Sequence, residues 1–111
     1  MKVSQFLKSG MKNFVEERPE GYEILGSAKE GVHRVEIYIK KSQNRITDAK
    51  FNASKRCKKL LAVAELVTER LKNQEADKIS INPDEILQFF AEEKEKEKMK
   101  NRLSIVLKAL K

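Results

Sequence analysis

The sequence predicts an α+β fold in which helices pack on one face of a small three-stranded antiparallel sheet. Two observations lead to this prediction. Apolar residues alternate with polar ones before residue 54, and they recur at helical spacing after it. Strands therefore come first and helices follow, an order typical of α+β proteins. The chain has 111 residues, the usual size of one domain, and we expect a single domain over residues 1–111.

The first half of the chain is predicted to form one helix and then three strands. Apolar residues at spacings of three and four indicate an amphipathic helix over residues 4–17, with Ser4 as its cap. Residues 32–41 are the clearest strand, and we expect further strands at residues 22–29 and 46–53. The alternation in the clearest strand places three apolar side chains on one face: Val35, Ile37 and Ile39.

The second half of the chain is predicted to be helical. A helix over residues 55–73 follows Ser54, which can cap it, and an Asn-Pro pair at residues 82–83 starts another. A last amphipathic stretch covers residues 103–110, and the charged segment 91–100 before it is a helical bridge or a loop. We expect one core shared by both halves of the chain: Val35, Ile37, Ile39, Ala49, Phe51, Leu60, Ala64, Val67, Leu71 and Leu107.

Composition and charge exclude several classes of protein. No segment approaches the ~20 consecutive apolar residues that a membrane span needs. The single cysteine cannot form an internal disulfide and the chain shows no signal peptide, so we expect a reducing, cytoplasmic setting. Charged residues make up 37% of the chain and the net charge is +7, which favours an acidic partner, nucleic acid being one candidate.

The sequence contains none of the common enzyme motifs. It has no GxGxxG, Walker, HExxH, CxxC or GxSxG pattern. One cysteine and one histidine, Cys57 and His33, are too few to indicate a Cys–His nucleophile pair. We therefore expect that the protein is not an enzyme and has no catalytic residues.

Cys57 lies among four cations at the expected start of a helix: Lys55, Arg56, Lys58 and Lys59. Their charge and the positive end of the helix dipole favour the thiolate, which indicates a reactive thiol or a metal ligand. The alternative is that Cys57 begins the apolar stripe of the helix as a small buried residue. The four cations are also candidate contacts for an anionic partner.

Four segments in the middle of the chain occur in a recognisable order: IYIK (37–40), ITDAKF (46–51), Cys57 and ELVTERLKNQ (65–74). In this order they resemble the iron–sulfur cluster assembly scaffolds, the IscU proteins and the N-terminal domain of NifU. Residues 18–21 resemble the end of that family's first helix and residues 102–111 its last helix, so the resemblance covers about residues 11–111. It implies a three-stranded antiparallel sheet backed by helices.

The resemblance also implies where metal ligands would lie. Scaffolds of this family bind zinc or a [2Fe–2S] cluster through three cysteines, with a histidine and an aspartate nearby. In this chain Lys29 stands at the first cysteine and Gly31 at the aspartate, while Lys98 and Met99 stand at a His–Cys pair. Only Cys57 is retained. Because ammonium groups replace ligands, we expect the monomer to bind neither zinc nor a cluster.

We interpret the chain as a divergent iron–sulfur scaffold-like protein that acts in iron–sulfur biogenesis through partner contacts. The resemblance implies that the partners are a cysteine desulfurase or cluster-recipient proteins. Two alternatives remain open. One is a basic module on the same fold that binds a protein or a nucleic acid without metal. The other is a carrier of thiol-bound sulfur, a persulfide, at Cys57.

Overall fold

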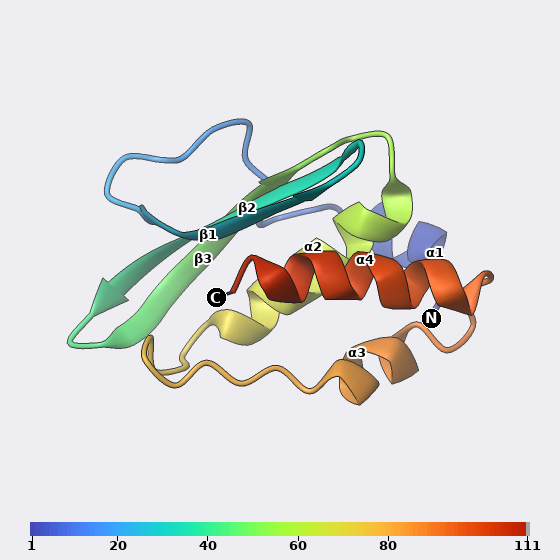
Figure 1. Cartoon of the computed structure of the whole chain (residues 1–111). Helices are drawn as coiled ribbons and strands as arrows, with labels where there is room; N and C mark the ends of the chain where they lie inside the picture. Colours follow the sequence, from blue (N-terminus) through green and yellow to red (C-terminus); the bar gives the residue numbers. More distant parts are fainter. Residues whose placement is uncertain (111) are drawn as a thin grey trace.

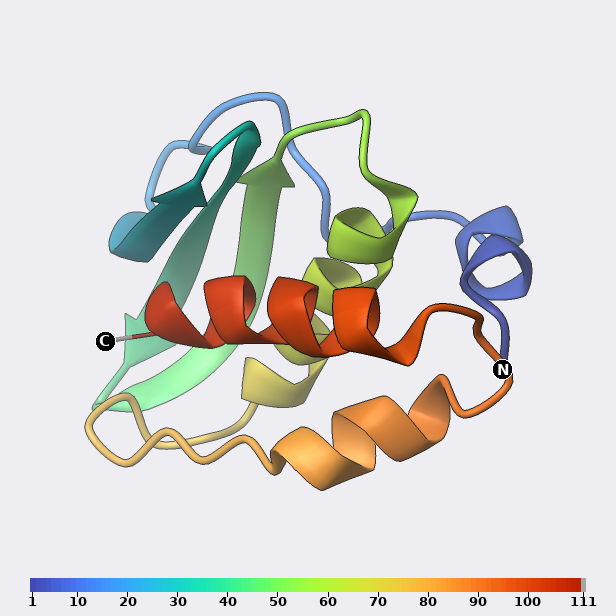
Figure 2. The ribbon, with the colours of Figure 1, turned by 45° about the vertical axis from the view of Figure 1, so that its right-hand side comes forward.

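A computed structural model of the chain describes residues 1–110 and confirms the α+β fold (Figure 1). Three antiparallel strands form one sheet in the order β1-β2-β3. Helices α2 and α4 pack on one face of this sheet, and α4 crosses α2 (Figure 2). No helix in the described part of the chain is long and apolar enough to cross a membrane. The elements follow one another as α1 (Val3–Lys8), β1 (Glu23–Glu30), β2 (His33–Ser42), β3 (Arg45–Ala53), α2 (Lys58–Leu71), α3 (Pro83–Phe89) and α4 (Lys96–Lys108).

The three strands lie where the alternating pattern predicts them. The turn between β2 and β3 holds Gln43 and Asn44 at φ of 51° and 68°, the left-handed values that a two-residue type I′ hairpin requires. Val35, Ile37 and Ile39 of β2 are buried against the helices, as the period of two predicts. The predicted face of the sheet is therefore confirmed.

Helix α2 lies at the centre of the core. Ten of its 14 residues are buried, and it packs against β3, α1, α3 and α4. Nine of the ten predicted core residues are buried, whereas Leu107 is only partly buried. Leu107 turns toward a hollow between α3 and α4, which it lines with Leu87 and Leu103. Ile105 and Val106 are the fully buried residues on this part of α4.

The N-terminal helix is shorter than predicted. It ends at Lys8 rather than at Glu17, and its N-cap residue is Lys2 rather than Ser4. Gly10 adopts a φ of 96°, a conformation that a continuing right-handed helix does not allow. The apolar spacing after this glycine therefore does not reflect a helix.

Residues 13–15 instead lie along the free edge of β3. The amide of Val15 donates to the carbonyl of Phe51 at 2.8 Å, and the amide of Phe51 donates to the carbonyl of Asn13 at 2.9 Å. The segment 16–22 then crosses the face of the sheet that the helices leave free (Figure 1). The sheet is thus covered on its second face by a loop rather than by a helix.

Helix α2 begins three residues later than predicted, at Lys58, with Cys57 as its N-cap residue. The predicted cap, Ser54, has a different role. Its hydroxyl accepts a hydrogen bond from the amide of Arg34 at 2.9 Å and donates one to the carbonyl of Val32 at 2.9 Å. Ser54 therefore fastens the β1–β2 hairpin to the end of β3, and the helix starts only after that connection is made.

The charged segment before the last helix divides at Glu95. Helix α4 begins at Lys96 and includes the second half of the segment, while residues 91–95 are not helical. The start of α3 agrees with the prediction, because the side chain of Asn82 accepts hydrogen bonds from two amides of the first turn and Pro83 follows it.

One carboxylate is buried in the middle of α2. Glu65 is 3% exposed, and its two oxygens accept hydrogen bonds from the backbone amide and the side-chain amide of Asn13 at 3.1 and 3.0 Å. The side-chain amide of Asn13 also donates to Glu69 at 3.0 Å, and the ammonium group of Lys72 donates to the side-chain oxygen of Asn13 at 2.7 Å. Burial raises the pKa of Glu65. The hydrogen bond from Asn13, with the help of Lys72, lowers the pKa of Glu69 to about 2.

We expect Ile37→Ala to lower the free energy of unfolding by about 2–5 kcal/mol, because Ile37 is fully buried between the sheet and the helices. Urea denaturation measures this loss. Ile24→Ala is the matched control: Ile24 lies in β1 and is 50% exposed, so its loss should be about 1 kcal/mol or less. Equal losses in the two variants would contradict the assignment of the buried face.

We also expect the contribution of Glu69 to stability to depend on pH. Its pKa in the folded protein, about 2, lies below its ordinary value of 4.5, so it stabilises the fold fully above pH 4.5. That stabilisation is lost as the pH falls from about 4.5 toward 2. Chemical denaturation should therefore show a clearly larger loss of stability in Glu69→Gln, relative to the wild type, at pH 7 than at pH 3. An equal difference at both pH values would refute this assignment.

Candidate functional site

Cys57 lies in a hollow at one end of the molecule. The hollow measures about 310 Å³ and is formed by three separate parts of the chain: the β1–β2 turn, the connection from β3 to α2, and the middle of α4. Cys57 itself is partly buried at the N-terminus of α2. The residues that line the hollow are Val32, His33, Ser54, Arg56, Cys57 and Arg102.

The closest polar contact of Cys57 comes from α4. The Nε of Arg102 donates a hydrogen bond to the sulfur of Cys57 at 3.2 Å. Another nitrogen of the same guanidinium donates to the side-chain oxygen of Asn101 at 2.5 Å, which holds the group in place. The guanidinium is permanently charged, so it places a positive charge in direct contact with the sulfur. The positive end of the 14-residue helix α2 lies at the same residue, its N-cap.

Strand register decides which side chains of the β1–β2 hairpin face the helices. Ala28 pairs with the buried Val35, so this pair faces the helices, and the next pair along the hairpin faces the opposite side. Lys29 and its partner on β2 thus point away from α4. Glu30 and His33 form the following pair and return to the helix side.

Glu30 connects the hairpin to α4. Its carboxylate accepts a hydrogen bond from the side-chain amide of Asn101 at 2.9 Å and lies 3.8 Å from the ammonium group of Lys108. His33 lies beside it, partly buried, and its Nδ1 is buried without a hydrogen-bond partner among the described residues. The hairpin therefore brings one carboxylate and one imidazole to the end of the molecule that holds Cys57.

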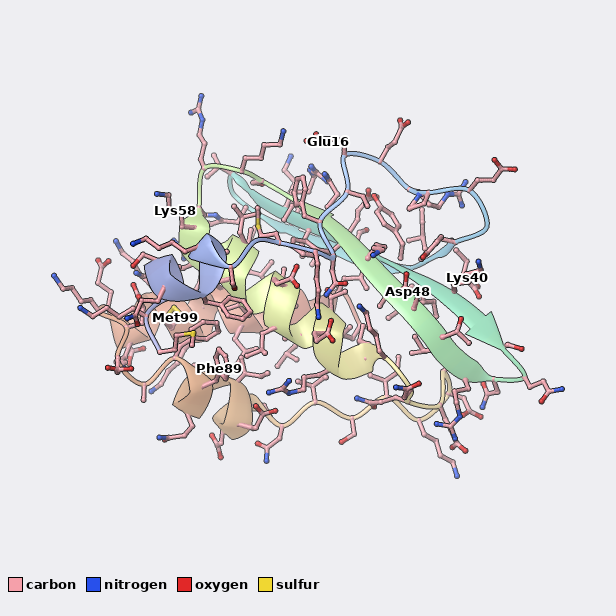
Figure 3. All side chains as sticks on the ribbon, turned by 180° about the vertical axis from the view of Figure 1, so that it is seen from behind. Glu16, Lys40, Asp48, Lys58, Phe89 and Met99 are labelled. Carbon is pink, nitrogen blue, oxygen red and sulfur yellow. The ribbon has the colours of Figure 1, made fainter. Side chains whose placement is uncertain are left out.

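The other sequence-predicted site residues lie elsewhere. Gly31 occupies the β1–β2 turn with a φ of 61°. Lys98 is exposed and pairs with Glu95 at 2.8 Å, while Met99 is 1% exposed and belongs to the core (Figure 3). Neither Lys98 nor Met99 lines the hollow that contains Cys57. The α4 side chain that does so, Arg102, follows Met99 by three residues, about one turn of helix.

The four cations around Cys57 divide into two pairs. Lys55 lies 2.7 Å from Glu16, and Lys59 is held in the structure by the carboxylate of Glu93 at 2.6 Å. Arg56 and Lys58 are exposed, and neither forms an ion pair within residues 1–110. Figure 3 shows Lys58 at the outer end of α2. The charge available to an external partner therefore comes from Arg56 and Lys58, and less from the other two.

The donor set around Cys57 does not fit zinc or an iron–sulfur cluster. Such sites take four ligands, mostly thiolates and imidazoles. Within the part of the chain that the structure describes, no three His, Cys, Asp or Glu side chains come together in a way that could hold a metal ion. The nearest charged group to the sulfur is a guanidinium, which repels a metal cation.

Comparisons with known proteins agree with this fold. The model of the NifU-like N terminal domain family matches residues 14–110. A putative iron–sulfur cluster assembly scaffold protein for the SUF system, from Fervidobacterium islandicum AW-1, is 13% identical with a TM-score of 0.63, over 97% of this chain and 90% of that one. A nitrogen-fixing NifU-like protein (N-terminal) from Brucella abortus is 11% identical with a TM-score of 0.62, over 97% of this chain and 85% of that one. A comparison with curated proteins gave no match.

The resemblance inferred from the sequence is thus confirmed. Identities of 11% and 13% to the solved structures show the shared fold. The family model spans most of the chain, including all three strands and the helices α2, α3 and α4. The chain therefore belongs to the NifU-like N-terminal domain family.

Proposed function

We propose that this chain is a divergent member of the scaffold family that acts in iron–sulfur biogenesis through contacts with partner proteins, and that the monomer does not itself hold zinc or a cluster. The observation that supports this function is the hydrogen bond from Arg102 to the sulfur of Cys57. Cys57 is the only cysteine of the chain, so no second thiolate compensates for the arginine.

The electrostatics of the hollow favour this interpretation. A metal ion is bound by thiolates because their negative charge and soft sulfur offset the loss of its hydration shell. In this hollow the guanidinium of Arg102 already balances the charge of a Cys57 thiolate, and Arg56 adds another cation to the lining. A metal would have to displace Arg102 and leave its charge unpaired beside the ion, which is unfavourable in a partly buried site.

Family membership supports proteins of iron–sulfur biogenesis as the proposed partners. The scaffold family works together with other proteins of iron–sulfur biogenesis, and we propose that a cysteine desulfurase or a cluster-recipient protein contacts this chain at the Cys57 end. Three parts of the chain meet there and the cations Arg56 and Lys58 are exposed. The proposed role is therefore to bind a partner at this end, with the sulfur of Cys57 held against the guanidinium of Arg102.

We expect Arg102→Cys to create a zinc site that the wild type lacks. The change removes the repelling cation and adds a second thiolate next to Cys57, and His33 on the same hollow can supply a third ligand. Competition with a zinc-binding dye should show zinc affinity at least about tenfold higher in Arg102→Cys than in the wild type. Lys98→Cys is the matched control, because Lys98 lies outside the hollow, and it should behave as the wild type.

Two results of this experiment would contradict the proposal. Stoichiometric zinc in the wild type would mean that other groups, or a second subunit, complete a site around Cys57. Equal zinc binding by Lys98→Cys and Arg102→Cys would mean that α4 presents residue 98 to Cys57, the position that the family resemblance assigns to a metal ligand. Circular dichroism of each variant establishes that the fold is retained.

A second candidate function is sulfur transfer at Cys57, and the same contact to Arg102 favours it. A thiolate can attack the terminal sulfur of a donor persulfide; a new S–S bond forms on Cys57, the donor's S–S bond breaks, and the donor leaves as a thiolate. Because the guanidinium of Arg102 places a positive charge beside the sulfur, Arg102→Gln should slow alkylation of Cys57 by iodoacetamide at pH 7 several-fold. Lys98→Gln should leave the rate unchanged. An equal or faster rate in Arg102→Gln would contradict a thiolate held by this arginine.

A further inference from the structure

A second hollow adjoins the one that contains Cys57. It measures about 580 Å³ and lies on the outer side of the β1–β2 turn, where the connection from β3 to α2 passes. The two hollows share Val32, Ser54 and Arg56 in their linings. Together they form one continuous surface over the turn, which we call the hairpin surface.

The hairpin surface carries a marked excess of positive charge. Arg34, Lys55 and Arg56 line the second hollow, and Glu16 is the only acidic residue in its lining. Glu16 is engaged with Lys55 at 2.7 Å, so it does not neutralise the two arginines. Arg102 lines the first hollow, where its charge is directed at Cys57.

The guanidinium of Arg34 is oriented by the fold but is not buried in an ion pair. One nitrogen of its guanidinium donates to the side-chain oxygen of Asn52 at 2.7 Å, and another lies 4.0 Å from Glu36. Asn52 is itself fixed, because its side-chain amide donates to the carbonyl of Val15 at 2.7 Å. The orientation of Arg34 is therefore determined by the fold, while its side chain remains 44% exposed.

One exposed apolar side chain, that of Val32, lines both hollows. Val32 is 82% exposed at the tip of the β1–β2 turn, the highest exposure among the large exposed apolar residues of residues 1–110. Its backbone carbonyl is held by the hydroxyl of Ser54 at 2.9 Å, so the tip is fixed to the body of the protein. An exposed aliphatic residue surrounded by arginines is suited to a partner that presents both apolar and acidic groups.

We propose that the hairpin surface docks a short acidic peptide segment of a partner protein, with carboxylates on Arg34 and Arg56 and an aliphatic side chain against Val32. This inference rests on the proposed function, because it states the chemistry of the partner that the proposed function requires. A peptide fits better than a nucleic acid: no Phe, Tyr or Trp lines either hollow, so unpaired bases would have no ring to stack on.

Fluorescence anisotropy with a labelled peptide of the sequence Glu-Leu-Asp-Glu-Leu-Asp tests the proposal. We expect the wild type to bind it and to bind the peptide with lysines in place of the acids at least about tenfold more weakly. Arg34→Gln combined with Arg56→Gln should weaken binding of the acidic peptide by about tenfold or more, and Val32→Ser by a few-fold. The charge-matched control is Lys78→Gln with Lys94→Gln, two exposed lysines that line neither hollow, and it should bind as the wild type does.

Three outcomes would overturn the proposal. The first is that the wild type does not bind the acidic peptide, and the second is that the arginine and the lysine variants lose equal affinity for it. The third is that the wild type binds a labelled single-stranded nucleic acid of six nucleotides more tightly than the peptide. The last outcome would assign the surface to nucleic acid. These results are separate from the zinc experiment with Arg102→Cys, because neither Arg34 nor Val32 contributes a metal ligand. If the acidic peptide does not bind, the proposal that Cys57 holds no metal is unaffected. If the wild type binds zinc, the result of the peptide experiment is unaffected.

Discussion

Helix α2 is buried on nearly every side, and the positions of the other elements follow from that burial. The sheet covers it through β3, and α1, α3 and α4 surround the remainder. A carboxylate enclosed in this way needs hydrogen-bond donors, so Glu65 requires Asn13, which draws the N-terminal segment onto the edge of β3. The same enclosure places the N-terminus of α2 beside the β1–β2 hairpin, and Cys57 lies at that junction.

We propose that this fold keeps the frame of the scaffold site while the chemistry of the site changes. The guanidinium of Arg102 lies directly beside the sulfur of Cys57. Because this positive charge belongs to a side chain, it is permanent, and it opposes the binding of a metal cation at the same place. The arginines of this region face in two directions. Arg102 faces inward to the sulfur of Cys57, and Arg34 and Arg56 face outward to the solvent. We infer that this division turns a ligand site into a contact surface.

Much of the fold could be predicted from the sequence, because periodicity reports which face of an element is buried. Ile37 and its neighbours on β2 were predicted in this way, and so was the Asn82 cap of α3. The helix expected up to Glu17 was wrong, because spacing alone cannot reveal that Gly10 turns the chain toward β3. The contact of Arg102 with Cys57 could not be predicted either. It depends on the rotation of α4 over the sheet, and one helical turn separates it from the position that alignment favoured.

Native mass spectrometry of the wild-type protein, isolated without oxygen or chelators, decides whether Arg102 or a metal ion is the partner of the Cys57 sulfur. The measured quantity is the mass of the intact folded protein, compared with the mass after denaturation in acid. We predict that the two masses agree, so that the folded protein carries no zinc, iron or sulfide. A folded species heavier by one zinc ion, or a dimer heavier by a [2Fe–2S] cluster, would contradict this prediction.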